Sequence, residues 1–327
     1  MVTENLSIFQ PASPTTESIR NLSILLFAIT GFIFILVEGV LFYCVVRFRK
    51  RATPSAEPPQ VYGSKPIEIA WTAAPGLIVL IILLVTTRTL WEVNTKPPRP
   101  RAADQTLFVT VIGRQWWWEY RYDHYNGKKL GFITANELHI PVSDGDVSRP
   151  VYLTLKSADV CHSFWVPRLS GKTDLIPGRV NSMWFQTERK GLFVGQCAEY
   201  CGTQHANMLL RVVVDSPQDF ERWLENQGKP AAEPSPALAA GKEAFLAQSC
   251  VNCHRVRGTL AQGSYAPDLT HLMSRQTLAA GMIPNTAENL RMWIEAPQKI
   301  KPGCLMPGFG LADRDRELIV GYLQNLR

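Results

Sequence analysis

The segment Cys197–Met208 contains four side chains of the kinds that bind soft metal ions: two thiols, one imidazole and one thioether. Soft sulfur ligands select copper, and imidazole suits copper in either redox state. The two cysteines are four residues apart, so two thiolates on one tight loop can bridge two copper ions. His205 and Met208 each supply one terminal ligand, and a further imidazole must come from elsewhere. His162, upstream, is the candidate.

The same residues admit two simpler interpretations, a disulfide between Cys197 and Cys201 or a zinc site. Zinc sites use CxxC pairs with histidine or cysteine more often than they use a thioether. A lone CxxxC pattern is a weak signal, but the thioether and the upstream histidine add to it. The complete constellation therefore favours copper.

Three motifs together resemble subunit II of haem-copper oxidases, the subunit that holds the dinuclear CuA centre. They are Asp159-Val-x-His162-Ser, Lys172-Thr-Asp174-x-Ile-Pro177-Gly178-Arg179 and Cys197-x-Glu199-x-Cys201-x3-His205-x2-Met208. The resemblance implies copper ligation by the side chains of His162, Cys197, Cys201, His205 and Met208 and by the backbone carbonyl of Glu199. It also implies a magnesium site for the Glu199 carboxylate, at the interface with catalytic subunit I.

Two apolar segments, at about residues 21–46 and 69–90, are each long enough to span a bilayer. The segment between them is rich in Lys and Arg, so the positive-inside rule places it in the cytoplasm and both termini outside. We expect residues 1–20 to form an external N-terminal segment with no conventional signal peptide. Residues 21–95 are then a transmembrane hairpin of a bacterial cell membrane.

Two acidic residues of the hairpin have alternative roles. Glu38 lies inside the first span, where a charge usually faces protein or water, and we interpret it as a contact with a partner subunit. Glu68 begins the second span on the cytoplasmic side. The resemblance implies a carboxylate here at the entrance of a proton channel into subunit I. An acidic residue that stabilises the helix N-terminus is the simpler alternative, and both can hold.

Residues 100–225 follow a proline-rich connection at 96–101 and are predicted to form an all-β domain. Short apolar segments separated by Gly and Pro indicate strands at residues 107–112, 151–155, 182–186 and 209–214. Such strands suggest an antiparallel sandwich or barrel, and the resemblance implies a Greek-key cupredoxin fold. It also implies an aromatic patch through which electrons enter, with Trp116 at the matching position. Packing in the core and against another subunit is the alternative for the aromatic run at 116–118, and it must account for some of these residues. Arg114 stands where the family commonly has histidine, so no role is transferred to it.

A linker at residues 226–237 leads to a second redox domain, residues 238–327, predicted to be all-α. Cys250-Val-Asn-Cys253-His254 is the attachment motif of a c-type haem: two thiols bond to the haem and the adjacent imidazole binds the iron. The sixth ligand is expected to be a downstream methionine, and the candidates are Met273, Met282, Met292 and Met306. Met282 and Met292 have the pattern of ordinary apolar residues in or near a helix. Met306 is preferred because it lies in a Pro-bounded extended segment that resembles the axial loop of small cytochromes c. The linker predicts a haem domain that moves freely between a donor and the copper domain.

These features predict an electron-transfer subunit of a membrane terminal oxidase, with a fused cytochrome c as in caa3-type enzymes. Electrons would pass from a soluble cytochrome c, another small redox protein or a bc1-type complex through haem c and CuA to subunit I, which reduces O2 in a proton-translocating complex. A CuA-containing nitric oxide reductase subunit is one alternative, and a membrane-tethered copper carrier or thiol reductase is a more distant one. The net charge of +6 is modest, and no recognition motif indicates nucleic-acid binding.

The remaining cysteines and histidines have simpler interpretations. Cys44 lies in a membrane span, while Cys161 and Cys304 are expected to be free and packed. His124, His139 and His271 are expected to be satisfied surface or loop residues, as are most histidines without a ligand pattern. The chain carries no oxygen-reducing site of its own in this interpretation.

Overall fold

The computed structural model describes residues 7–49, 60, 62–94, 105–145 and 147–327. They divide into two units, the described parts of Glu17–Thr95 and those of Met1–Thr16 with Lys96–Arg327. The proline-rich connection predicted at 96–101 lies outside the described residues.

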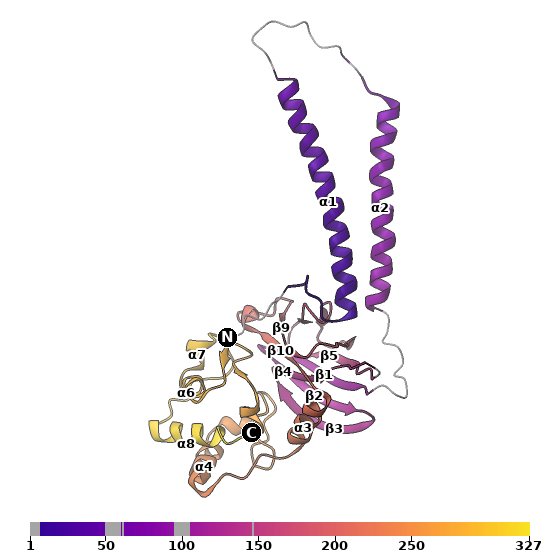
Figure 1. Ribbon diagram of the computed structural model, residues 1–327. Coiled ribbons are helices and arrows are strands. Elements are labelled where there is room, and N and C mark those ends of the chain that lie inside the picture. The colour runs from indigo at the N-terminus through magenta and orange to yellow at the C-terminus, as the bar shows by residue number, and fades with distance from the viewer. Residues whose placement is uncertain (1–6, 50–59, 61, 95–104, 146) are drawn as a thin grey trace. The chain divides into compact units, whose positions relative to one another are not determined.

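The first unit consists of two long apolar helices, α1 (Pro14–Arg47) and α2 (Lys65–Asn94) (Figure 1). The 34 residues of α1 span about 51 Å at ~1.5 Å per residue, more than the ~30 Å hydrocarbon core of a bilayer. Most of their large apolar side chains are exposed, which in water would be unfavourable. Ser18 Oγ donates to a carboxylate oxygen of Glu92 at 3.0 Å and so links the two helices. The predicted pair of membrane-spanning helices is therefore present.

The β domain is a sandwich of two five-stranded sheets, with strand orders β3-β2-β1-β5-β8 and β4-β10-β9-β6-β7. The first sheet contains β1 (Leu107–Arg114), β2 (Trp117–Tyr125), β3 (Lys128–Ala135), β5 (Val151–Ser157) and β8 (Asn181–Phe185). The second contains β4 (Glu137–Pro141), β6 (His162–Trp165), β7 (Thr173–Leu175), β9 (Gly191–Cys197) and β10 (Leu209–Asp215). All four strands predicted from the sequence are found. The pairs β1–β5 and β4–β10 are parallel, so the expectation of a purely antiparallel sandwich was wrong, and both sheets are mixed, as in a cupredoxin.

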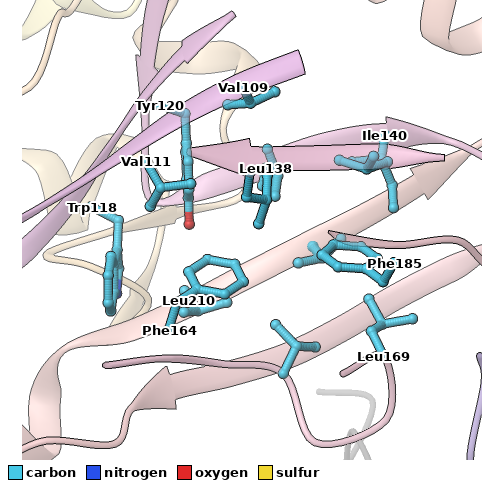
Figure 2. Close-up of a cluster of buried hydrophobic side chains, with 14 of the residues drawn as sticks. Val109, Val111, Trp118, Tyr120, Leu138, Ile140, Phe164, Leu169, Phe185 and Leu210 are labelled. Atoms are coloured by element: carbon cyan, nitrogen blue, oxygen red, sulfur yellow. The ribbon is translucent and has the colours of Figure 1, made fainter. Parts of the chain in front are cut away.

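The inner faces of the two sheets form one apolar core, in which side chains from both sheets point toward one another (Figure 2). Trp118 and Tyr120 from β2 meet Leu138 from β4, Phe164 from β6 and Leu210 from β10, and all five are fully buried. The aromatic run is thus mainly core: Trp118 is inside, while Trp116 and Trp117 are half-buried. Trp117 and Trp118 differ because successive side chains of a strand face opposite sides of a sheet, whereas Trp116 lies in the turn before β2.

A helix, α3 (Pro217–Gly228), follows the last strand and covers the end of this core. Its N-cap is Ser216, whose hydroxyl accepts from the Asp219 amide at 3.2 Å. Trp223 packs against Tyr122 with ring centroids 5.1 Å apart. Because α3 continues to Gly228, the first three residues of the predicted linker are helical.

The C-terminal domain is helical, as predicted, around its own core. Its helices are α4 (Ala239–Ala247), α5 (Cys250–Cys253), α6 (Ala287–Glu295), α7 (Pro297–Ile300) and α8 (Asp313–Leu323), with a two-stranded ladder of β11 (Thr277–Leu278) and β12 (Ile283–Pro284). Helices α4 and α8 cross at Gly241, where an added Cβ would lie 2.3 Å from the Leu318 carbonyl oxygen. Only glycine permits so close an approach, which places Phe245 against Tyr322 in the core.

Candidate copper and haem sites

Three neighbouring strands of the second sheet bring the predicted copper ligands together. Strand β6 begins at His162 and pairs with β9, which ends at Cys197, through the register of Phe164 opposite Cys197. Strand β10 begins one residue after Met208, so the ligand segment connects two antiparallel neighbours. The Cys197 amide donates to the Met208 carbonyl at 3.0 Å and closes the base of this loop.

The sulfur, nitrogen and carbonyl donors of this loop face one another. The two Sγ atoms of Cys197 and Cys201 are 3.8 Å apart, far longer than the ~2.0 Å of a disulfide bond. Cys197 Sγ lies 3.2 Å from the Glu199 carbonyl oxygen and 3.9 Å from His162 Nδ1. Cys201 Sγ lies 3.6 Å from His205 Nδ1. All six predicted donors therefore gather around one pair of sulfur atoms.

Met208 completes the set, with its Sδ 3.8 Å from Cys201 Sγ. His162, Met208 and both cysteines are buried, and His205 is half-buried. The set provides two thiols, two imidazoles, a thioether and a carbonyl, which fits soft copper much better than a tetrahedral zinc site. The residues present thus suit a dinuclear copper centre, which these six donors would hold.

The two thiols are strongly coupled. The hydrogen bond between them is the largest cause of a pKa of Cys197 far below its usual range, and the same contact raises the pKa of Cys201. One thiolate is therefore favoured before any metal arrives, and thiolate is the form that binds metal.

Asp159 fixes the imidazole of His162. It belongs to the same sequence motif as His162 but is not one of the predicted ligands. His162 Nε2 lies 2.7 Å from Asp159 Oδ1, so Nδ1 is the nitrogen that faces Cys197. Burial alone would raise the pKa of Asp159, but hydrogen bonds from His162 and from the Gln115 and Val160 amides lower it. A carboxylate behind a metal-binding imidazole fixes its tautomer and orientation.

Glycine makes room for this imidazole. A Cβ added at Gly113 would lie 2.7 Å from Cδ2 of the His162 ring. Nothing in the sequence alone connects Gly113 to the histidine, because the contact joins β1 of one sheet to β6 of the other. The site therefore depends on how the two sheets pack.

Trp116 lies directly against the ligand loop. Its indole Nε1 donates to the Cys201 carbonyl at 2.9 Å, and the Gln115 side-chain amide donates to the same oxygen at 2.8 Å. Gly202 has φ +115 and lies so close that an added Cβ would be 3.0 Å from the Trp116 ring. The predicted site of electron entrance is thus bonded to the backbone of a predicted copper ligand.

In the haem domain, α5 presents the two attachment cysteines and is followed by His254. His254 Nδ1 lies 2.7 Å from the Pro267 carbonyl oxygen, which leaves Nε2 for an iron ligand. Burial lowers the pKa of His254 and so favours the neutral imidazole that metals bind. These features fit a c-type haem with His254 as proximal ligand.

The predicted axial methionine lies on an open segment. Met306 is half-buried, its neighbour Leu305 is 76% exposed, and the Gln298 side chain donates to the Met306 carbonyl at 2.9 Å. Met292, rejected as a ligand, lies on α6 and is exposed. The pairing of Met306 with His254 remains a prediction.

Among the other cysteines and histidines, Cys161 and His139 differ from expectation: His139 lies in strand β4 with 13% of its side chain exposed, not at the surface or in a loop. Cys304 is free and half-buried, but Cys161 is exposed, so the prediction that it is packed was wrong. It lies between the bend at residues 158–160 and the start of β6 and is exposed. His139 stacks on Trp223 and lies 2.8 Å from an Asp215 carboxylate oxygen, and His271 contacts two backbone carbonyls.

In the hairpin, the two acidic residues have different surroundings. Glu68 lies in the first turn of α2, where its carboxylate accepts from the Ser64 amide at 3.2 Å, as expected of an acid that caps a helix. Glu38 is exposed on α1. Their roles in proton uptake and subunit contact remain predictions.

Comparison with known proteins agrees with these features over nearly the whole chain. The transmembrane domain of cytochrome c oxidase subunit II matches residues 2–88, its periplasmic domain matches residues 107–216, and the cytochrome c family matches residues 238–327. Cytochrome c oxidase subunit 2 of Alkalihalophilus pseudofirmus is 34% identical over 327 residues, covering 99% of this chain and 92% of the relative. The Bacillus subtilis protein of the same name is 32% identical and covers 98% and 92%.

Among solved structures, the periplasmic domain of cytochrome oxidase subunit II from Bradyrhizobium japonicum is 31% identical. It covers 37% of this chain and 92% of its own, with a TM-score of 0.33.

Two apolar helices, a cupredoxin sandwich with a sulfur-rich site and a helical domain with a haem-attachment motif define a membrane-anchored electron-transfer protein. The chain belongs to the cytochrome c oxidase subunit II family, in the form that carries a C-terminal cytochrome c domain. It is an electron-transfer subunit of a haem-copper oxidase and associates with the catalytic subunit of that complex.

Proposed function

We propose that the loop Cys197–Met208 and His162 hold a dinuclear copper centre, and that this centre accepts electrons from haem c within the same chain. The observation that carries the proposal is the pair of sulfur atoms 3.8 Å apart, with imidazole, thioether and carbonyl donors arranged around them. Copper bound there supplies reversible one-electron chemistry. The buried sandwich fixes the donors, so a change of charge requires little movement of the protein.

Haem attachment is assigned to Cys250 and Cys253, with His254 and Met306 as iron ligands. The orientation of His254 by the Pro267 carbonyl supports the proximal half of this assignment. A thioether ligand raises the potential of a haem, which suits a carrier that receives electrons from a donor outside the chain. That donor is a soluble cytochrome c, another small redox protein or a bc1-type complex.

The test of the copper proposal is electron paramagnetic resonance of the oxidised, copper-loaded full-length protein. One unpaired electron shared by two equivalent copper nuclei should give hyperfine coupling to both. Three outcomes would contradict the dinuclear assignment: a signal from a single copper nucleus, zinc bound tightly at one ion per chain, or a disulfide between Cys197 and Cys201 in metal-replete protein.

The soluble domains are proposed to lie on the outer side of a bacterial cell membrane. The basic residues Arg47, Arg49 and Lys65 at the inner ends of the two helices support this orientation. The exposed thiol of Cys161 provides the test. A membrane-impermeant maleimide should label the chain in intact spheroplasts, and labelling at this position should disappear in Cys161→Ser.

Two further roles rest on family resemblance together with exposure. The Glu199 side chain is exposed while its carbonyl faces Cys197, so its carboxylate is available to a magnesium ion at the interface with subunit I. Glu68 is proposed to start proton uptake at the cytoplasmic end of α2. In the assembled oxidase, Glu199→Gln should lower bound magnesium, whereas Glu68→Gln should lower proton uptake and leave magnesium unchanged.

A further inference from the structure

The haem domain and the copper domain belong to one compact unit, and a buried lysine connects them. Lys301, at the end of α7, is only 3% exposed. Its ammonium donates to the carbonyls of Trp116 at 2.9 Å and Asn207 at 2.8 Å, both in the copper domain. The third donor goes to the Ala279 carbonyl of its own domain at 3.1 Å. An ammonium has three N–H donors, so all of them are used.

Two of the three acceptors belong to residues next to the predicted copper ligands. Asn207 precedes the predicted ligand Met208, and Trp116 is bonded to the Cys201 carbonyl. Burial lowers the pKa of Lys301 to about 8, whereas three converging carbonyl oxygens favour the charged form. The ammonium therefore binds two segments of the copper domain at once.

A buried carboxylate makes the reciprocal connection. Glu137, on β4 of the copper domain, is 2% exposed. It accepts from the backbone amides of Gln276 at 2.9 Å and Thr277 at 2.9 Å and from the Thr277 hydroxyl at 2.8 Å. These residues lead into and begin β11 of the haem domain. Each domain thus places one buried charged group against polar groups of the other, which are mainly backbone groups.

The turn between β11 and β12 adapts its backbone to the same contact. Ala279, Ala280 and Gly281 all have positive φ, at 54, 61 and 89. A positive φ is uncommon for alanine. It allows the Ala279 carbonyl to accept from Lys301 and the Ala280 carbonyl to accept from the Leu209 amide at 3.2 Å. Leu209 directly follows the ligand Met208.

The segment that leads to Met306 lies against the copper loop. The Gln204 side chain donates to the Pro302 carbonyl. A Cβ added at Gly303 would lie 3.9 Å from the Thr203 side chain. In this structure polar contacts join the two domains, and the free movement expected of the haem domain on its linker stays a prediction.

We propose that Lys301 and Glu137 form a reciprocal clamp that fixes the haem domain on the copper domain, with the Met306 segment against the copper-ligand loop. A buried charge that loses its partners is strongly unfavourable, so the clamp permits one arrangement of the two domains. Both residues are positioning residues, since neither is a ligand. The role of the clamp in electron transfer rests on the proposed function, whereas the clamp itself does not.

The test uses the full-length protein within the assembled oxidase, with Lys301→Met and the matched control Lys299→Met. Lys299 lies on α7, two residues before Lys301, and is exposed. Hydrogen exchange measured on peptides that contain residues 276–281 and 204–209 should become about tenfold or more faster in Lys301→Met, a change that corresponds to ~1.4 kcal/mol of lost protection. Lys299→Met should exchange like the wild type. Unchanged exchange in Lys301→Met would overturn the clamp.

A second variant approaches the clamp from the other domain. Glu137→Gln should loosen the same haem-domain peptide, while the exposed control Glu188→Gln should not. This variant keeps the test decisive if Lys301→Met does not assemble. Unchanged exchange of this peptide in Glu137→Gln would likewise overturn the reciprocal clamp.

The electron-transfer role has its own measurement, in the same variants with intact haem and copper spectra. Rapid reduction of haem c followed by slower reduction of copper in both clamp variants supports positioning. Loosened peptides with an unchanged rate would show that the clamp does not position the redox centres. Absence of the dinuclear copper signal from wild-type protein would instead contradict the proposed function, and the exchange result would still decide the clamp.

Discussion

The two redox domains prepare their metal ligands to different degrees. In the copper domain the donors already converge, with Met208 and both cysteines buried between strands that are closed by backbone hydrogen bonds. In the haem domain only one ligand, His254, is oriented by a bonded neighbour, while Met306 lies on an open segment. A β-sandwich core fixes a small metal site in advance, whereas a haem is large enough to become part of the core that positions its own ligands.

The comparison breaks down if the copper donors do not form one centre, and the largest expected effect tests this. The double variant Cys197→Ser/Cys201→Ser should lose the copper signal completely, because both thiols that would hold copper are gone. In the assembled complex mixed rapidly with a reduced donor, haem c should still be reduced while the haems of subunit I stay oxidised. Reduction of subunit I at the normal rate would mean that electrons bypass the copper site.

The corresponding change in the haem domain removes one ligand rather than the site. Met306→Leu should abolish the low-spin spectrum of His/Met ligation and lower the haem potential, since a thioether ligand raises it. Covalent attachment should survive, because it depends on Cys250 and Cys253. Met292→Leu, on the exposed side of α6, is the matched control. Loss of the spectrum in Met273→Leu but not in Met306→Leu would contradict the assignment.

Packing in the haem domain can be tested at the α4–α8 crossing. Gly241→Ala should destabilise the domain by about 1–3 kcal/mol, because the added Cβ would lie 2.3 Å from the Leu318 carbonyl oxygen. Gly321→Ala is the control: its Cβ would be in ordinary contact at 3.6 Å, and alanine is favoured in a helix by roughly 1 kcal/mol. Thermal unfolding followed by haem absorbance distinguishes the two, and equal stability of both variants would rule out the crossing as the constraint.

The preorganisation of the copper ligands depends in part on Asp159, which orients His162. Asp159→Ala should lower copper affinity by roughly 10–100-fold, the usual effect of losing a residue that orients a ligand. The cysteines and the fold should be unaffected, since Asp159 lies at a half-exposed bend. Competition with a copper chelator measures the change. An unchanged affinity would mean that packing against Gly113 alone orients His162.

The ligand types were predictable from the sequence because metal chemistry restricts them to few residues at short spacing. The copper loop and the haem motif each lie within one segment, and the strands alternate clearly. The residues that position them were not predictable. Gly113 contacts His162 across the two sheets. The Lys-Pro-Gly sequence that begins at Lys301 has no feature that predicts its contacts with the carbonyls of Trp116 and Asn207. Such contacts join segments far apart in the chain, and periodicity carries no signal of them.

The smallest expected effect compares the two domains by one matched change in each. Ser216 caps α3 in the copper domain and Thr286 caps α6 in the haem domain, and each hydroxyl accepts one backbone amide at 3.2 Å. Ser216→Ala and Thr286→Ala should each cost about 1 kcal/mol. If the clamp makes the domains unfold together, both variants lower the midpoint temperature of one shared calorimetric transition of the full-length protein. If the domains unfold independently, each variant shifts only its own transition. Lys301→Met should convert the first pattern into the second, because it removes a buried connection and leaves both caps intact.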